Sequence, residues 1–427
     1  MPESRVLLMI AASQNPDLLR TPHEMGLEVV LAAATPPADD SLYDVHLAVD
    51  EFDEEAVLAA VRGHLARDGR VDAVATFHEG SLHVAARVAA ELGLPGNSPE
   101  AVRAMRDKFL TGQRLTEAKV PTPGTRVATT FAEAQEAAAE LGFPLVLKPQ
   151  ASASSQGVTK VSDETELKAA FDNITGLFEP DAFHDGAYSV PNVAHIYAYP
   201  QADGVLIQEY VSGEEFAVDL VYGGGEYRLL AIHDKPYPFA EPHFIEGAYA
   251  TPSALSRDEQ ALLLDTAVAA LKALGATVGG AHVELRLTDG GPKIIEVNGR
   301  LGGTTAFVQE SIRESTGVWG PREYLRAVLG EPLDFTAKEQ PTPAGFSPLL
   351  ADRSGEIAGF TGVEEVMEIP GVIGVRWMAK PGDHVVIKYP ENPVSCFALI
   401  LARGESREQV LSALEGAEKV LKPVYTD

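Results

Sequence analysis

The stretch IIEVNGRLGG, residues 294–303, decides the fold of this sequence. Its apolar residues predict a β-strand, yet Glu296, Asn298 and Arg300 occupy every second position. Side chains alternate between the two faces of a strand, so these three polar groups share one face. A strand that only packs in a core would carry hydrophobic residues there. We therefore interpret this polar face as part of a binding site.

The segment before it predicts the partner strand of a β-hairpin. GGAHVELRLTDGGPKIIEVNGR contains two strand-like runs around a turn, with His282 and Glu284 two residues apart on the first run. Antiparallel pairing could place Glu284 opposite Glu296, although the sequence does not fix the register. Opposed carboxylates repel each other, so we expect a cation between them. Carboxylate and amide oxygens suit Mg²⁺, and an arginine beside them is placed to hold an oxyanion. The alternative is a solvated hairpin edge that Arg300 neutralises.

A second stretch with the composition of a phosphate site is the loop ASASSQGV, which follows the strand FPLVLKP. Small residues and Gly157 let backbone N–H groups approach phosphate oxygens. Together with Lys148 at the strand end, the loop predicts a lid over a triphosphate, although a serine-rich turn is the alternative. The pattern is not a Walker A motif. Lys108, in MRDKFLT, is a second candidate cation, and its alternative is a surface lysine. The candidate hydroxyls of the loop belong to Ser152, Ser154 and Ser155.

A third element is IQEYVSGEEF, in which a strand stops at Glu209, Tyr210 and Val211. Free backbone groups at such a strand end can pair with the edge of an adenine. Glu215 follows the turn and could accept hydrogen bonds from ribose hydroxyls. Taken alone, the segment is more simply explained as an acidic hairpin.

Composition limits the classes of function. The 427 residues include 62 Asp and Glu against 34 Lys and Arg, a formal charge of −28, which argues against partners such as nucleic acid or anionic membranes. An anionic ligand would need a local cluster of cations. Cys396 is the only cysteine, so no intrachain disulfide can form and we expect a cytoplasmic protein. No apolar stretch reaches the roughly 20 residues that span a bilayer.

The pattern of elements predicts three domains. Residues 1–118 alternate strand and helix signals, which indicates a parallel Rossmann-like sheet, but without GxGxxG a dinucleotide site is not supported. A smaller lid domain is expected over residues 119–211 and a C-terminal domain over residues 212–427, strand-rich from about residue 331.

These motifs together resemble the ATP-grasp superfamily. The segments RDK, LVLKP, the small-residue loop, QEYVSGEEF, HVELRLT and IIEVNGRLGG occur in its order and approximate spacing over residues 1–330. The resemblance implies an α/β (overall α+β) ATP-grasp fold with an N-terminal Rossmann-like domain, a small lid domain and a large C-terminal domain on an antiparallel sheet. Within the superfamily the chain is most similar to carboxylate–amine ligases, in particular bacterial L-amino acid ligases that make dipeptides.

The resemblance also implies four groups of site residues. The nucleotide would be bound by Lys108, Lys148, Ser152, Ser154, Ser155, Gly157, Glu209, Tyr210, Val211 and Glu215. The metal ligands would be Glu284, Glu296 and Asn298. The residues that steady the acyl-phosphate and the tetrahedral intermediate would be Arg300, Gly302 and Gly303. The substrate site would include His243, Glu246, His282 and Thr304. Some dipeptide ligases carry a bulky aromatic residue where this chain has Thr304, so a preference for tiny substrates is not carried over.

The implied reaction is ATP- and Mg²⁺-dependent amide formation, with Mn²⁺ as a substitute metal. A carboxylate attacks the γ-phosphate to give an acyl-phosphate and ADP, and an amine then displaces phosphate. Either His243 or His282 could accept the proton of the amine. The expected partners are small-molecule carboxylates and amines, with the chain acting as a homodimer.

The sequence leaves two alternative functions open. Another ATP-grasp chemistry, such as carboxylation or a purine-pathway ligation of phosphorylated substrates, would require further basic residues, and the sequence shows no such cluster. The other alternative is a catalytically silent nucleotide-binding protein. The intact set of acidic residues, asparagine and arginine argues against it.

Overall fold

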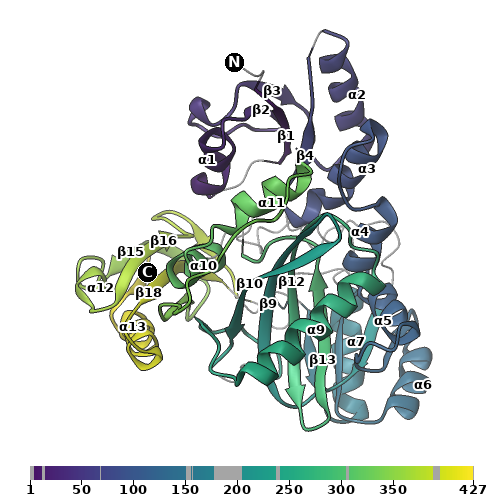
Figure 1. The fold of residues 1–427 in the computed structure, drawn as a ribbon. Coiled ribbons are helices and arrows are strands. Elements are labelled where there is room, and N and C mark those ends of the chain that lie inside the picture. Colours follow the sequence, from purple (N-terminus) through teal and green to yellow (C-terminus); the bar gives the residue numbers. More distant parts are fainter. Residues whose placement is uncertain are drawn as a thin grey trace.

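The structure is a computed structural model, and Figure 1 shows its arrangement. The described residues are 4–11, 15–67, 69–150, 155, 157–176, 204–236, 241–303, 307–387 and 395–426. Three predicted site residues, Ser152, Ser154 and Thr304, lie outside this described part.

The N-terminal region forms a four-stranded parallel sheet in the order β3-β2-β1-β4. Its strands are β1 (Val6–Ile10), β2 (Glu28–Ala33), β3 (Val45–Ala48) and β4 (Ala73–Ala75). The helices of this region are α1 (Pro16–Glu24), α2 (Glu54–Leu65), α3 (Leu82–Leu92), α4 (Pro99–Arg106) and α5 (Lys108–Glu117), with single 3₁₀ turns at Asp40–Leu42 and Glu79–Ser81. All five residues of β1 are buried, as expected for a strand covered on both faces. The predicted alternation of strands and helices is therefore confirmed.

The next region is a four-stranded antiparallel sheet in the order β5-β8-β6-β7, covered by two helices. The elements are β5 (Thr125–Ala128), α6 (Phe131–Leu141), β6 (Leu145–Pro149), β7 (Thr159–Val161), α7 (Glu164–Gly176) and β8 (Val205–Glu209). The sequence signal for α6 holds, since Thr130 and Glu133 form a capping box. Leu145 and Leu147 of β6 pack in the core beneath the helices. The alternate residue Lys148 lines a cavity on the other face of the sheet.

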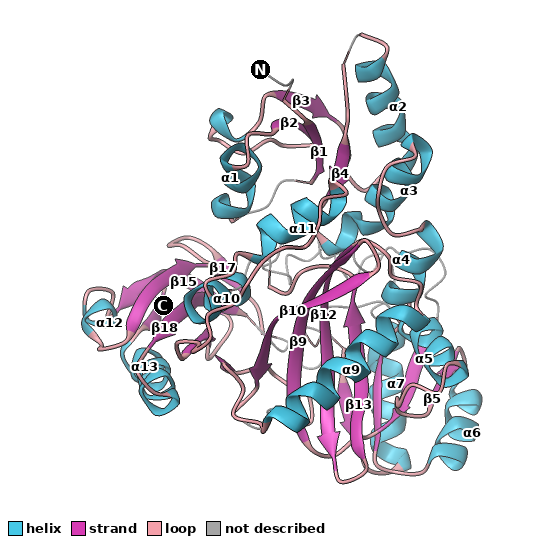
Figure 2. Ribbon diagram, viewed as in Figure 1, coloured by secondary structure: helices cyan, strands magenta, loops and turns pink. Residues whose placement is uncertain are grey.

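An eight-stranded antiparallel sheet forms the centre of the molecule (Figure 2), in the order β13-β12-β9-β10-β11-β14-β18-β16. Its strands are β9 (Glu214–Gly223), β10 (Glu226–Asp234), β11 (Tyr249–Thr251), β12 (Gly279–Thr288), β13 (Gly291–Asn298), β14 (Ala344–Leu350), β16 (Val372–Trp377) and β18 (Cys396–Arg403). The predicted hairpin is present as β12 and β13. Helix α9 (Arg257–Ala273) packs on β13, and its capping box joins Ser256 to Glu259 as the sequence predicts.

The C-terminal residues extend this sheet and add a small sheet beside it. The further elements are α10 (Val308–Thr316), α11 (Gly320–Val328), β15 (Gly355–Thr361), α12 (Glu365–Glu368), β17 (His384–Val385), α13 (Arg407–Val420) and β19 (Lys422–Tyr425). Strands β17, β15 and β19 form the small sheet, while β14, β18 and β16 continue the central one. None of the helices in the described part of the chain is long and apolar enough to cross a membrane.

Candidate active site

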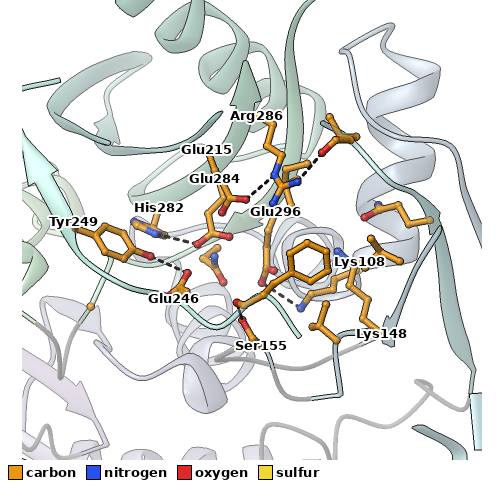
Figure 3. Close-up of a pocket in the computed structure, with 18 of the residues that line it drawn as sticks. Lys108, Lys148, Ser155, Glu215, Glu246, Tyr249, His282, Glu284, Arg286 and Glu296 are labelled. Atoms are coloured by element: carbon orange, nitrogen blue, oxygen red, sulfur yellow. Dashed lines mark hydrogen bonds and ion pairs between the residues drawn. The ribbon is translucent and has the colours of Figure 1, made fainter. Parts of the chain in front are cut away.

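A cavity of about 350 Å³ lies between the sheet that carries β6 and β8 and the central sheet (Figure 3). Figure 3 shows Lys108 and Lys148 at one end of it, Tyr249 and Glu246 at the other, and a row of glutamates between them. The cavity therefore joins a cationic end to an acidic one, and the strands bring together residues from distant parts of the sequence.

The hairpin of β12 and β13 carries the polar face that the sequence predicts. Glu284 pairs with Glu296 across the two strands, and His282 pairs with Asn298. All four side chains line the cavity. One of the two opposed carboxylates has a cation beside it, because Lys108 Nζ lies 3.1 Å from Glu296 Oε1. The register that the sequence left open is thus the one that opposes the two carboxylates.

A lysine that the sequence interpretation missed lies among three of the glutamates. Lys235 Nζ donates to Oε1 of Glu215 at 2.7 Å, of Glu246 at 2.9 Å and of Glu284 at 3.0 Å. Burial alone would lower the pKa of Lys235, but these carboxylates, Glu215 foremost, raise it well above its usual value. Burial opposes ionisation of Glu284 as well, yet Lys235 and His282 hold its pKa below the usual range. Lys235 therefore keeps its charge and links the three glutamates.

Arg286 fixes the acidic row to the end of β8. Its Nε donates to Glu215 Oε2 at 2.9 Å, and its Nη1 donates to the carbonyl oxygen of Val211 at 2.6 Å. The guanidinium also lies over the rings of Tyr210 and Phe244, at 5.6 and 5.4 Å from their centroids. Residues 209–211 and Glu215, both predicted to contact the nucleotide, are thus held side by side.

Lys148 reaches the cavity from β6 and is 4% exposed. Burial lowers its pKa to about 8, and nearby Lys108 acts in the same direction, whereas Glu296 opposes the shift. A lysine whose charge is this poorly solvated favours an anionic partner, since an anion would restore the stabilisation that water no longer provides.

Behind the hairpin, Asp219 is fully buried between two histidines. His282 Nδ1 lies 3.0 Å from Asp219 Oδ1, and His233 Nδ1 lies 3.2 Å from Oδ2. Although burial would lower the pKa of His282, Asp219 raises it to about 9. A Cβ on Gly302 would come within 2.4 Å of His282 Nδ1 and 2.6 Å of Asp219 Oδ1, so only glycine fits there. Gly302 therefore packs behind the cavity and is not among the residues that line it.

Arg300 and Gly303 line the cavity beyond the end of β13. Arg300 Nε pairs at 2.9 Å with Oε2 of Glu79, which belongs to the turn after β4 in the N-terminal region. Gly303 has a φ of +54°, in the left-handed region that favours glycine. The N-terminal region thus orients the arginine that the sequence assigns to the reacting group.

The loop after β6 contacts the segment before β11. Ser155 Oγ donates to the carbonyl oxygen of Phe244 at 2.9 Å, and Gly157 takes a φ of +71°. His243 Nδ1 lies 3.4 Å from the carbonyl oxygen of Val158, and His243 is not among the described residues that line the cavity. Its predicted contact with a substrate consequently has no geometric support, whereas Ser155 does line the cavity.

Most of the described candidates do converge. Those that line the cavity are Lys108, Lys148, Ser155, Glu209, Tyr210, Val211, Glu215, Glu246, His282, Glu284, Glu296, Asn298, Arg300 and Gly303. The alternation that singled out His282 and Glu284 also places Arg286 on the same face of β12, so the sequence did contain a signal for that residue. Lys235 lies just after β10 in IHDKPYP, a stretch without a motif, and no such signal marks it.

The donor set fits a hard divalent cation. Two opposed carboxylates and the side chain of Asn298 face one cavity that also presents two lysines to an anion. Glu215, Glu246 and Glu284 form a second grouping, whose oxygen atoms lie within 4.8 Å of one another. Lys235 already supplies a cation to that grouping.

Three family models match the chain in succession. They are an ATP-grasp N-terminal domain over residues 20–96, an ATP-grasp domain over residues 141–307 and an L-amino acid ligase C-terminal domain 2 over residues 348–426. The structure is similar to that of L-amino acid ligase from Bacillus licheniformis, with a TM-score of 0.82 and 25% identity over 100% of this chain and 99% of the other. These matches confirm the predicted fold class.

Two relatives extend the likeness in sequence. Carnosine synthase 1 of Gallus gallus is 31% identical over 287 residues, which are 66% of this chain and 29% of that protein. Alanine–anticapsin ligase of Bacillus amyloliquefaciens is 30% identical over 255 residues, 58% of this chain and 52% of that protein. The chain thus spans less than two thirds of the length of each of these relatives. Its ordered motifs, its fold and its succession of domains place the chain in the ATP-grasp superfamily, and its sequence and structure are similar to those of carboxylate–amine ligases such as the L-amino acid ligases.

Proposed function

We propose that this chain joins an amino acid, or another small carboxylate, to an amine at the expense of ATP, with release of ADP and phosphate. The observation that carries the proposal is the cavity itself. It brings a carboxylate pair with an asparagine, two lysines and an arginine to one place, the set that activation of a carboxylate by phosphoryl transfer requires. The relatives named as L-amino acid ligase and alanine–anticapsin ligase support amino acids as substrates.

In the proposed complex the nucleotide lies along the cationic end. Lys108 and Lys148 contact its phosphates, the backbone of residues 209–211 contacts adenine, and Glu215 accepts hydrogen bonds from the ribose. Glu215 already accepts hydrogen bonds from Lys235 and Arg286, so the ribose hydroxyls would share its oxygens with them. The loop with Ser155 covers the phosphates, and its closure would exclude water from a hydrolysable acyl-phosphate.

Glu284, Glu296 and Asn298 would hold Mg²⁺, or Mn²⁺ in its place. When bound, the metal neutralises the charge of the phosphates. Arg300 and the backbone of Gly303 face the carboxylate substrate and stabilise the charge on its carbonyl oxygen as the amine adds. The ion pair with Glu79 would help to hold the arginine side chain in place.

In the protein without metal or nucleotide, His282 is a poor acceptor for the proton of the amine. Asp219 raises the pKa of its ring to about 9 against the effect of burial, so the ring already carries its proton at neutral pH. His243 lies against Val158, just before β7, and is not among the described residues that line the cavity. The phosphate that leaves is then the simplest acceptor.

The proposal extends to the organisation of the protein. We propose a cytoplasmic homodimer with the three domains expected from the sequence, residues 1–118, 119–211 and 212–427. The sheet from Thr125 to Glu209 lies within the second of these ranges, and β9 to β18 lie within the third.

The test is to measure ADP and phosphate release with Mg²⁺ and pools of carboxylates and amines. We expect one ADP and one phosphate per amide formed, with release only when a carboxylate and an amine are both present. Release that depends on bicarbonate, or on a phosphorylated amine, would support the alternative chemistries. The absence of nucleotide turnover with every pool would contradict the assignment as an enzyme.

A further inference from the structure

The chain that follows β13, residues 299–303, is held from more than one side. We call these five residues the glycine segment. Arg300 and Gly303 line the cavity, whereas Leu301 and Gly302 between them are buried. Leu301 is 2% exposed and belongs to a hydrophobic core cluster. The two residues that would face a substrate are therefore joined by two that are anchored in the protein.

One contact of the glycine segment is with strands β9 and β12. Asp219 and His282 are directly paired across these strands, and Asp219 Oδ1 lies 3.0 Å from His282 Nδ1. The backbone of Gly302 lies so close to both side chains that a Cβ would not fit there. Because Asp219 is completely buried, the carboxylate and the ring that it holds cannot move apart without opening a void. The pair therefore forms a rigid support for Gly302.

A second contact is with helix α10, which follows the glycine segment in the chain. Gln309 is 1% exposed, and its Nε2 donates to the carbonyl oxygen of Gly302 at 3.1 Å. Two residues further on, Ser311 Oγ lies 2.9 Å from His233 Nε2. The other ring nitrogen of His233 lies 3.2 Å from Asp219 Oδ2. The helix is therefore connected to Gly302 directly through Gln309, and through His233 to the support behind it.

These contacts matter for the proposed reaction because an oxyanion site depends on donors that are fixed in advance. A displacement of such a donor by about 1 Å removes much of its benefit. We infer that Gln309 and Asp219 are positioning residues, which hold the glycine segment so that Arg300 and Gly303 face the carbonyl oxygen of the activated carboxylate. The inference rests on the proposed function for the role of Arg300 and Gly303. Neither Gln309 nor Asp219 is among the described residues that line the cavity, so both would act through the glycine segment and not by contact with a substrate.

The test compares the wild type with Gln309→Met and Asp219→Asn, two variants that keep the size of the side chain. Methionine cannot donate to Gly302, and the asparagine amide can accept from only one of the two histidine rings. In crystal structures with ADP and Mg²⁺, we expect the glycine segment of each variant to be displaced by about 1 Å or to have raised B-factors. Steady-state ADP release should show kcat lowered by roughly tenfold or more. The KM for ATP should stay unchanged, because the lysines that would contact its phosphates are not altered.

The matched control is Thr316→Val, an isosteric change of a buried hydrogen-bonding residue at the other end of α10. It should lower the melting temperature without changing kcat. Gln309→Met removes no charge, so the test does not depend on the folding of Asp219→Asn.

An undisplaced glycine segment in both variants would overturn the inference, as would unchanged kcat values. A loss of kcat in Thr316→Val as large as in Gln309→Met would also overturn it. If the segment is displaced in the variants but the wild type forms no amide, the contacts of Gln309 and Asp219 do hold the glycine segment and the proposed ligase activity is refuted. The two claims therefore fail separately.

Discussion

At the scale of single residues, the polar face of β13 holds groups on which the proposed reaction depends. Glu296→Gln keeps the shape of the side chain but removes the charge that faces Lys108 and the proposed metal. Because the metal neutralises the phosphates only when its carboxylate ligands hold it, we expect kcat/KM to fall by roughly 10²-fold or more. Steady-state ADP release, with thermal unfolding as the check on folding, measures this. Retained turnover would refute the role of Glu296.

A second prediction at this scale concerns Lys235. Lys235→Met replaces a buried ammonium by an apolar group of similar length and leaves Glu215, Glu246 and Glu284 without it. Removal of one partner from a buried ion cluster costs roughly 3–5 kcal/mol, so the melting temperature should fall by several degrees. A divalent cation should then stabilise the variant more than the wild type, because three carboxylates gain a cation again. Equal stabilisation of both proteins by MgCl₂ would contradict this account of the cluster.

The lowered pKa of Lys148 predicts that both stability and ATP affinity depend on pH. Its pKa is lowered by burial from 10.5 to about 8, so the folded state disfavours the charged form. The resulting cost to stability is fully present below pH 8 and is relieved as the pH rises from 8 to 10.5. Nucleotide phosphates need the charged form, so ATP affinity should weaken by about tenfold per pH unit above pH 8. Displacement of a fluorescent nucleotide measures this, and Lys148→Arg should remove the dependence. A wild type as insensitive to pH as the arginine variant would contradict the assignment.

At the scale of elements, the turn after β4 connects the N-terminal region to the site. Glu79→Gln weakens the hold on Arg300, so we expect kcat to fall by roughly tenfold while KM for ATP changes little, because the nucleotide is bound elsewhere. The control is Glu331→Gln, which breaks the exposed ion pair with Arg5 and should change kcat and stability only slightly. If Glu79→Gln and Glu331→Gln lost the same stability and had the same kcat, the positioning role of Glu79 would be contradicted.

The same scale shows how far the sequence predicts the molecule. Alternation of polar residues was enough to find the β12–β13 hairpin, because it is a local signal and the partner strands are adjacent in the chain. Lys235 was not predictable, because its three partners come from β9, β12 and the segment before β11 and meet only through strand pairing. The family resemblance implied a place for His243 in the substrate site, yet its contact with Val158 depends on how the sheet of β5 to β8 lies against the central one. The family resemblance implied a backbone donor at Gly302, and the structure adds a second requirement for glycine there, the close approach of His282 and Asp219.

At the scale of the whole molecule, the net charge of −28 makes the local placement of cations decisive. Lys108, Lys148 and Arg300 come from α5, β6 and the end of β13, so only the folded chain assembles a site for an anion.

The proposed homodimer also belongs to this scale. Strand β16 is the last in the central sheet, and Ile373 and Trp377 on it are exposed, as edge residues that meet a partner would be. Sedimentation equilibrium should give a molecular mass twice that of the chain, and the Trp377→Glu variant should give the mass of a single chain. A wild-type protein with the mass of a single chain would contradict the proposal.

The most direct measurement of the central claim follows an oxygen atom. The carboxylate substrate is labelled with ¹⁸O and incubated with the protein, ATP, Mg²⁺ and an amine, and the released phosphate is analysed by mass spectrometry. Ligation through an acyl-phosphate transfers one ¹⁸O from the carboxylate to each phosphate for every amide formed, and Arg300→Ala should abolish both products together. Phosphate without the label, or released without an amide, would contradict the account.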